Sequence, residues 1–440
     1  MNEIELRLAR LRELMKREHL SAFIFPSTDA HQSEYVADHW RGREWISGFN
    51  GSAGTAVVTM KSAALWTDSR YFLAAEEQLE GTEYQLMRLK MKGTPTIAEW
   101  LGKELQDVQS PEVGLDGMVN SYNYVKDLSY SLRKLGGITL RTNLDPLEQI
   151  WENRPSLPAN PVVIQPLEYA GETLASKVAR IRKSLRELHA DGMLVSALDD
   201  IAWTLNLRGT DVHCNPVFVS YLLIESDKVS LFVDDNKLSP EVKQYLQDNQ
   251  VSLYKYNKVE KCLESYSGYN ILLDGNETSY YLWKAVKCQE IVAAGSPIPA
   301  MKAVKNKAEI AGYRSAMLKD GVAMVKFLKW LKPAVEAGGQ TEISIDEKLT
   351  SLRAEQKLFR DISFDTIAGY AQHGAIVHYE ATPETDVVLK PEGLILIDSG
   401  AQYQDGTTDI TRTIALGAVS EEMKHIYTLV LKAHIQLELV

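Results

Sequence analysis

The sequence predicts two related α/β domains followed by an α+β domain. Two observations lead to this prediction. An order of helix, strand and turn near the start of the chain recurs roughly 170 residues later, and the last part places helices before antiparallel-looking strands. A shift of this size indicates duplicated domains, because solenoid repeats recur every ~20 to 50 residues. A chain of 440 residues also exceeds one ordinary domain. We therefore expect domains at 1–157, 158–300 and 301–440.

The first copy starts with apolar residues at helical spacing, from Ile4 to Leu14, followed by the run "SAFIFP". Two further apolar runs, "TAVVTM" and "AALWTD", predict strands, and a helix is expected from Tyr71. The stretch "AFIFP" lacks polar alternation, which predicts a strand buried on both faces. We therefore expect an apolar sheet covered by helices.

The second copy repeats this order over residues 176–248. Its predicted elements are a helix, three strands and a second helix, in "SKVARIRKSLRELHA", "GMLVSA", "PVFVSYLLI", "VSLFVDD" and "SPEVKQYL". The Pro-rich stretch "RPSLPANP", residues 154–161, predicts the linker between the copies. If the two domains are duplicates, their sheets must have the same strand order.

The third domain follows a second boundary near "GSPIPAMKAVKNKAE". A long helical pattern over 308–331, ended by Pro333, and the helix start "TEISIDEKL" precede the strand runs. These runs are "FDTIAG", "GAIVHY", "VVLKPEGLILID" and "TDITRTIAL".

A last helix is expected from its N-cap Ser420, and the sequence after it has no helix stop signal. We therefore expect an incomplete third domain whose last helix exposes Ile426, Val430 and Leu437.

Composition indicates a soluble globular protein, with 45% apolar and 24% charged residues. The net charge of -11 argues against nucleic acid or an anionic membrane as a partner, and no apolar run reaches the ~18 residues of a membrane span. The N-terminal helix is amphipathic and does not resemble a signal peptide. Three widely spaced cysteines fit buried thiols in a reducing compartment, so we expect a cytoplasmic protein.

The stretch "LILIDSGAQYQDGTTDITRT" places two acids, Asp398 and Asp409, at the ends of an apolar hairpin. Asp is depleted in strands, so an acid that closes "LILI" requires an explanation. In one interpretation Asp398 caps the strand, Asp405-Gly406 forms the turn and Asp409 faces water. In the other, the two carboxylates face each other and bind hard divalent cations.

Hairpin geometry separates the two interpretations. A two-residue turn at Asp405-Gly406 would place the acids on one face but four residues, or ~13 Å, apart. Direct opposition would require a loop centred between Tyr403 and Gln404. The metal interpretation therefore predicts a longer loop or a bulge, for which Gly400 is the candidate.

The segment "DSGAQYQDGTTDITRT", preceded by His378 in "GAIVHY", resembles the aminopeptidase P family, in particular its cytosolic three-domain form. Further stretches that carry the resemblance are "PSTDAHQSEY", "SGFNGSAGTA", "WTDSRYFL", "DIAWTLNLRGTDVHCNPVFVSY" and "KAVKN". The resemblance implies two creatinase-like α/β domains ahead of a "pita-bread" catalytic domain. It also implies a metal-dependent Xaa-Pro aminopeptidase, which removes the N-terminal residue from peptides with proline in second position.

By the same resemblance, Asp398 would chelate one metal, Asp409 would bridge two, and His378 would hydrogen-bond the substrate. The family's dinuclear centre usually holds manganese and uses five ligands. Its remaining His and two Glu would lie beyond Val440. We therefore expect the 440 residues to hold no fully occupied dinuclear centre and to be inactive by themselves.

Two alternative functions stay open at this stage. One is a prolidase-type dipeptidase on the same catalytic scaffold, and the other is a non-enzymatic binding module that has lost the site. For the aminopeptidase we expect proline-containing peptides as substrates, no nucleic acid or membrane partner, and a homodimer in the complete enzyme.

Overall fold

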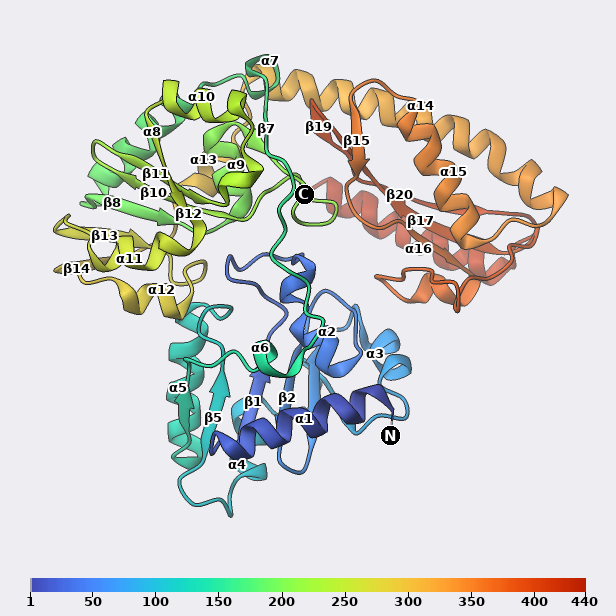
Figure 1. Cartoon of the computed structure of the whole chain (residues 1–440). Helices are drawn as coiled ribbons and strands as arrows, with labels where there is room; N and C mark the ends of the chain where they lie inside the picture. Colours follow the sequence, from blue (N-terminus) through green and yellow to red (C-terminus); the bar gives the residue numbers. More distant parts are fainter. Residues whose placement is uncertain (1) are drawn as a thin grey trace. The chain divides into compact units, whose positions relative to one another are not determined.

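A computed structural model describes residues 2–440 (Figure 1). The chain divides into two compact units, with the boundary between Ala308 and Glu309. The first unit contains two six-stranded sheets, and the second contains two three-stranded sheets. Each unit is described by itself below.

The first sheet has the strand order β4-β3-β2-β1-β5-β6. Its strands are β1 (Ala22–Phe25), β2 (Thr55–Thr59), β3 (Ala63–Thr67), β4 (Tyr84–Arg88), β5 (Glu112–Leu115) and β6 (Thr139–Arg141). The accompanying helices are α1 (Glu3–Arg17), η1 (Asp38–Trp40), α2 (Gly42–Ser47), α3 (Phe72–Gln78), α4 (Ile97–Glu104), α5 (Tyr122–Gly136) and α6 (Leu147–Ile150). Along β1, Phe23 and Phe25 belong to one apolar core and Ala22 and Ile24 to another. As predicted, this strand is buried on both faces.

The second sheet has the order β12-β11-β10-β8-β13-β14. Its strands are β8 (Gly192–Val195), β10 (Ser220–Glu225), β11 (Val229–Val233), β12 (Val251–Lys255), β13 (Asn270–Leu273) and β14 (Glu290–Ala293). The accompanying helices are α7 (Leu167–Ala170), α8 (Leu174–Glu187), α9 (Leu198–Leu205), η2 (Asp235–Lys237), α10 (Pro240–Asp248), η3 (Tyr256–Lys258), α11 (Val259–Glu264), α12 (Tyr280–Ala285) and α13 (Ile298–Ala303). A short pair, β7 (Val163–Ile164) and β9 (Leu207–Arg208), lies outside this sheet.

The two sheets have the same topology. In each, the first strand pairs antiparallel with the second and parallel with the fifth, and the third and fourth strands are parallel. The second and third strands are antiparallel in both sheets, and the pairs β5 with β6 and β13 with β14 are parallel. The predicted duplication is confirmed by this identity of order and direction.

The second unit contains two long helices and a pair of antiparallel sheets, with orders β15-β18-β19 and β16-β17-β20. Its elements are α14 (Lys307–Ala337), α15 (Glu342–Ala354), β15 (Phe359–Ile362), β16 (Ile367–Tyr370), η4 (Ala371–Ala375), β17 (Leu394–Ser399), β18 (Ala401–Tyr403), β19 (Gly406–Thr407), β20 (Ile410–Ala415) and α16 (Glu421–Glu438). This arrangement is the α+β domain that the order of helices and strands predicted.

The predicted end of the long helix at Pro333 is wrong, because α14 continues to Ala337. A proline within a helix removes one backbone hydrogen bond and strains the preceding turn. Here Leu331 and Val335, on either side of Pro333, are buried in the apolar core shared with α15 and the sheet. Burial of these side chains offsets the cost of the proline, and the helix ends where Gly338 takes a left-handed conformation.

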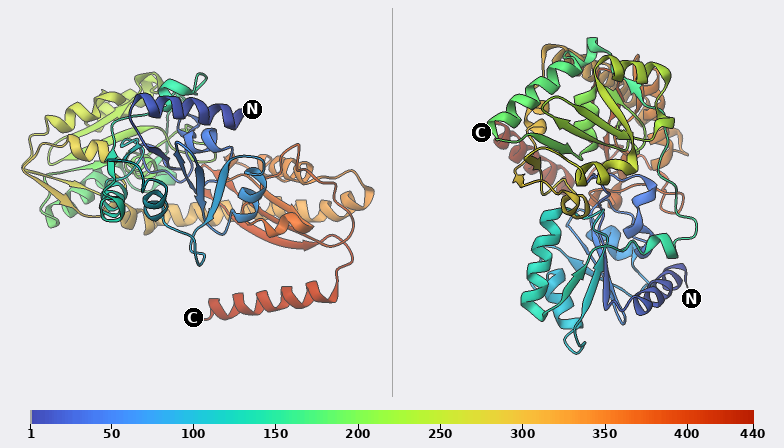
Figure 2. Two further views of the ribbon diagram at one scale, coloured as in Figure 1. Left: turned by 90° about the horizontal axis from the view of Figure 1, so that it is seen from below. Right: turned by 60° about the vertical axis from the view of Figure 1, so that its left-hand side comes forward.

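The last helix, α16, begins after the predicted N-cap Ser420, whose hydroxyl accepts a hydrogen bond from the Met423 N–H. Figure 2 shows α16 standing apart from the sheets of its unit. The expected exposure of its apolar side chains is confirmed, with Ile426 52%, Val430 64% and Leu437 77% exposed. Across residues 2–440, no helix combines the length and apolar character needed to cross a membrane.

Candidate metal centre

The two predicted acids lie on neighbouring segments of the sheet β16-β17-β20. Asp398 is in β17, and Asp409 comes directly before β20. Asp398 pairs with Thr411 in the β17–β20 ladder, so Asp409 is displaced by two residues from direct opposition. An even displacement keeps both side chains on one face, as diagonal neighbours across the two strands.

The two carboxyl groups are close enough to influence each other's ionisation. Partial desolvation, and then the charge of the nearby Asp398, raise the pKa of Asp409 above its usual value. The Thr411 hydroxyl donates a hydrogen bond to Asp398 Oδ1, at 2.6 Å. The Asp398 side chain is half-buried, whereas Asp409 is exposed. The pair is therefore close together and open on one side.

The interpretation with an Asp405-Gly406 turn is wrong by one residue. Tyr403 pairs with Gly406, so the turn consists of Gln404 and Asp405. This register reduces the predicted separation of the acids from four residues to two. Contacts with α14 explain it: the Lys319 ammonium binds Asp405 Oδ1 at 2.6 Å, and a Cβ at Gly406 would lie 3.1 Å from the Ala316 Cβ.

The predicted bulge at Gly400 is not observed. The pairs Ser399–Ile410 and Gln402–Thr407 keep one register on either side of Gly400. Gly400 instead marks the point where the strand passes from one sheet to the other. A Cβ there would lie 2.1 Å from the Ser363 Oγ and from the Thr408 carbonyl oxygen. Only glycine fits this crossing, which places Asp398 and Asp409 where the two sheets separate.

His378 is not on a strand, and the prediction that "GAIVHY" is one is wrong. Residues 371–375 form the 3-10 helix η4, and half-buried His378 lies in the turn that follows. A Cβ at Gly369 would lie 2.9 Å from the Gly374 Cα, so two glycines allow the chain to fold back on itself. The segment is therefore a folded-back loop rather than a strand.

The loop that carries His378 reaches the sheet face of Asp398. A Cβ at Gly374 would be 3.9 Å from the Leu396 Cβ. Leu396 and Asp398 are two residues apart in β17, so their side chains lie on the same face of the sheet. The opposite face, with Ile395 and Ile397, packs in the core. The loop and the carboxylate pair thus share one side of the sheet.

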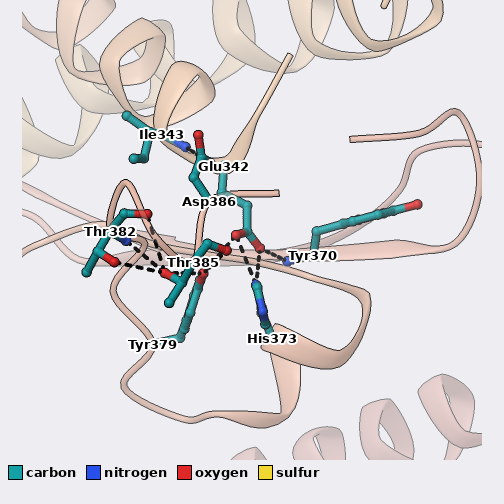
Figure 3. Close-up of polar contacts among 8 residues, drawn as sticks. All are labelled: Glu342, Ile343, Tyr370, His373, Tyr379, Thr382, Thr385 and Asp386. Carbon is teal, nitrogen blue, oxygen red and sulfur yellow. Dashed lines mark hydrogen bonds and ion pairs between the residues drawn. The ribbon is translucent and has the colours of Figure 1, made fainter. Parts of the chain in front are cut away.

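A buried carboxylate that the sequence did not single out, Glu342, organises this loop (Figure 3). Its side chain is fully buried at the start of α15. It accepts hydrogen bonds from the Tyr370 N–H at 2.7 Å, the His373 Nδ1 at 3.0 Å and the Tyr379 hydroxyl at 2.9 Å. Desolvation, together with the hydrogen bond to Glu342, raises the pKa of Tyr379. In the sequence, an acid after the N-cap Thr341 is typical of an ordinary helix start, so nothing distinguished it.

Comparison with known proteins defines the class. Residues 7–142 and 153–309 each match the creatinase/prolidase N-terminal domain, and residues 311–438 match metallopeptidase family M24. Two creatinase-type domains ahead of an M24 domain are the architecture of a metallopeptidase. The predicted boundaries near 157 and 300 stay predictions.

Relatives of known activity narrow this class. The chain is 38% identical to the Xaa-Pro aminopeptidase ApepP of Drosophila melanogaster, over 97% of its own length and 71% of that protein. It is 37% identical to Xaa-Pro aminopeptidase 1 of Dictyostelium discoideum, over 99% and 71%. The crystal structure of X-prolyl aminopeptidase from Caenorhabditis elegans, described as a cytosolic enzyme with a di-nuclear active site, matches with a TM-score of 0.90 and 31% identity, over 96% and 71%.

This chain belongs to the Xaa-Pro aminopeptidase family and is a metallo-aminopeptidase. The family resemblance is confirmed, and so is the predicted fold of two creatinase-like domains with a pita-bread domain.

Proposed function

We propose that Asp398 and Asp409 are ligands of a dinuclear metal centre that hydrolyses the bond before proline in Xaa-Pro peptides. The observation that carries the proposal is the strand register, which places the two carboxyl groups two residues apart on one open face of the sheet. Two carboxylates this close repel each other when both are ionised, and a divalent cation relieves that repulsion. All-oxygen donors fit hard ions such as Mn²⁺ and Mg²⁺. Manganese is the metal that we propose.

Each residue has one role in this proposal. Asp398 would bind one ion, and Asp409 would bridge the two. Bound ions would act as Lewis acids on the carbonyl group of the bond to be cleaved. His378 would hydrogen-bond the substrate, and the loop that carries it lies on the sheet face of Asp398. The C. elegans relative with its di-nuclear active site supports this assignment.

We further propose that metal binding by this chain depends on both Asp398 and Asp409. Of the five ligands that the family resemblance implies, two are identified in this chain, namely Asp398 and Asp409. Metal affinity falls as charged ligands are lost, because each contributes to neutralising the dication.

Calorimetric titration of Mn²⁺ tests the site. We expect weak binding that is lost in Asp409→Ala and retained in Glu384→Gln, a control that removes an exposed carboxylate from the same unit. Equal binding by the first variant and the unchanged chain would disprove the ligand assignment. Stoichiometric binding of two ions, or turnover of an Xaa-Pro peptide, would show that other residues of the chain complete the centre.

We also propose a cytoplasmic location and a homodimer. No disulfide bond involves Cys214, Cys262 or Cys288, and the C. elegans relative is described as cytosolic. Cell fractionation tests the location, and light scattering after gel filtration tests the dimer.

A further inference from the structure

We propose that Glu342 is a positioning residue that holds the loop carrying His378 over the sheet face of the carboxylate pair. This inference rests on the proposed function, in which His378 contacts the substrate. Glu342 lies on α15, far from His378 in sequence, and its role depends on contacts that flank His378 on both sides.

The first group of contacts anchors the two ends of the turn that contains His378. His373 Nδ1 contacts both Glu342 oxygens at 3.0 Å, and the Tyr379 hydroxyl donates to Glu342 Oε2 at 2.9 Å. Between these anchors, the Ile376 N–H donates to the His373 carbonyl, and the Tyr379 N–H donates to the Ile376 carbonyl. His378 therefore lies within a closed turn. Figure 3 shows His373 and Tyr379, at the two ends of this turn, both bound to the Glu342 carboxylate.

A second group of contacts returns the chain to the same helix. Asp386 Oδ1 accepts a hydrogen bond from the Ile343 N–H at 3.1 Å, and the Glu342 N–H donates to the Val387 carbonyl. The Tyr379 hydroxyl also lies 3.1 Å from Thr385 Oγ1. Both limbs of the loop thus close on the start of α15.

The charge of Glu342 makes these contacts obligatory. A carboxylate with no exposure to solvent must be compensated, and removal of its donors leaves a costly unpaired group. Its compensation comes from the loop and from the helix N-terminus. Because the carboxylate can be satisfied only when the loop is closed, loop closure and burial of Glu342 are coupled.

The chemistry of the contact provides a spectroscopic test. A carboxylate only accepts hydrogen bonds, so His373 must carry a proton on Nδ1. In Glu342→Gln the new amide can donate to His373 Nδ1, provided that His373 moves its proton to Nε2. The substitution would then keep the loop closed while it changes the His373 tautomer.

Nitrogen-15 NMR of the histidine-labelled chain, without metal, is the experiment, with signals assigned from His373→Asn and His378→Asn. We expect the unchanged chain to show a protonated His373 Nδ1. Glu342→Gln should convert it to an acceptor and leave the His378 signals in place, whereas Glu342→Ala should shift or broaden the His378 signals. Tyr379→Phe removes one anchor without removing the ring, and should also shift them even if Glu342→Ala does not fold.

Thr341→Ala is the matched control, because it removes the N-cap of the same helix and leaves the Glu342 carboxylate. A purely structural role in α15 would make this variant shift the His378 signals as Glu342→Ala does, and that result would overturn the proposal. Unchanged His378 signals in both Glu342→Ala and Tyr379→Phe would also overturn it. Since the readout uses neither metal nor turnover, it can succeed even if the Mn²⁺ titration disproves the proposed site.

Discussion

Gly312 of α14 packs against the backbone of Asp405, and a Cβ at Gly312 would lie 2.1 Å from the Asp405 carbonyl oxygen. Asp405 is in the turn of the hairpin whose strands carry Asp398 and Asp409. The close approach of helix and turn therefore supports the register that brings the two carboxylates together.

Gly312→Ala should destabilise the second unit and weaken Mn²⁺ binding, because the methyl group must displace the turn. The same helix offers a control in Gly321, where a Cβ would meet nothing within 4 Å. Gly321→Ala should raise the free energy of unfolding by about 0.5–1 kcal/mol through helix propensity. Urea unfolding measures both variants, and a stabilising Gly312→Ala would contradict the packing argument.

The ion pair between Asp320 and Arg353 links α14 to α15 in the core. Both side chains are fully buried, Arg353 Nε lies 2.7 Å from Asp320 Oδ1, and the Tyr403 hydroxyl also donates to Asp320. Arg353→Met would leave an unpaired buried charge, and we expect it to lower the free energy of unfolding by about 3–5 kcal/mol.

Two further variants check that expectation by urea unfolding. The double change Asp320→Leu with Arg353→Met should recover much of the loss, because no unpaired charge remains. Lys326 and Glu355 join the same two helices through an exposed pair, so Lys326→Met should leave the unfolding midpoint nearly unchanged. Equal effects at the buried and the exposed pair would be inconsistent with this account.

His31 connects the first two domains and should make their association sensitive to acid. Its Nδ1 lies 3.0 Å from the Ser196 carbonyl, its Nε2 lies 2.9 Å from the Tyr256 hydroxyl, and Asp29 and Lys237 are the charges that act on it. Burial lowers the pKa of His31 below 6.5 despite the opposing effect of Asp29. A histidine with a lowered folded-state pKa contributes stability that is complete above 6.5 and is lost as the pH falls below it.

Urea unfolding between pH 8 and about pH 5 tests this dependence, since the unfolded pKa is about 6.5. We expect the loss of stability on acidification to be smaller in His31→Gln than in the unchanged chain. His189→Asn changes an exposed histidine and should keep the full dependence. Identical pH profiles for the His31 variant and the unchanged chain would rule out the assigned role.

Asp116 should have the opposite pH dependence. Burial, and then the charge of Asp145, raises the pKa of Asp116 to about 7, against an ordinary value of 3.8. An acid with a raised folded-state pKa favours folding when protonated, so its ionisation costs stability as the pH rises from about 4 through about 7. Asp116→Asn keeps the oxygen that accepts from the Met118 N–H and should be more stable than the unchanged chain at pH 8, but not at acidic pH. Thermal unfolding at both pH values provides the measurement.

Much of the fold could be predicted from local patterns. Unbroken apolar runs such as "AFIFP" indicated strands buried on both faces, and the repeated order of elements predicted one topology for two sheets. The N-cap residues Thr341 and Ser420 marked helix starts because capping depends on neighbours within one turn. The acids of the candidate centre were also recognisable, since Asp in an apolar strand is unusual.

Three features were decided only by the tertiary structure, because each depends on contacts with residues distant in the sequence. The packing of Gly406 and Asp405 on α14 set the hairpin register, so the two-residue offset of Asp398 and Asp409 could not be read from the hairpin itself. Pro333 remains helical because its neighbours are buried against α15 and the sheet. The His378 loop folds back because buried Glu342 requires its donors. The sequence by itself determined most of the helices and strands, because these depend on interactions between near neighbours, and it identified the two carboxylates. Their register and orientation followed only from long-range packing, whose energies no local pattern encodes.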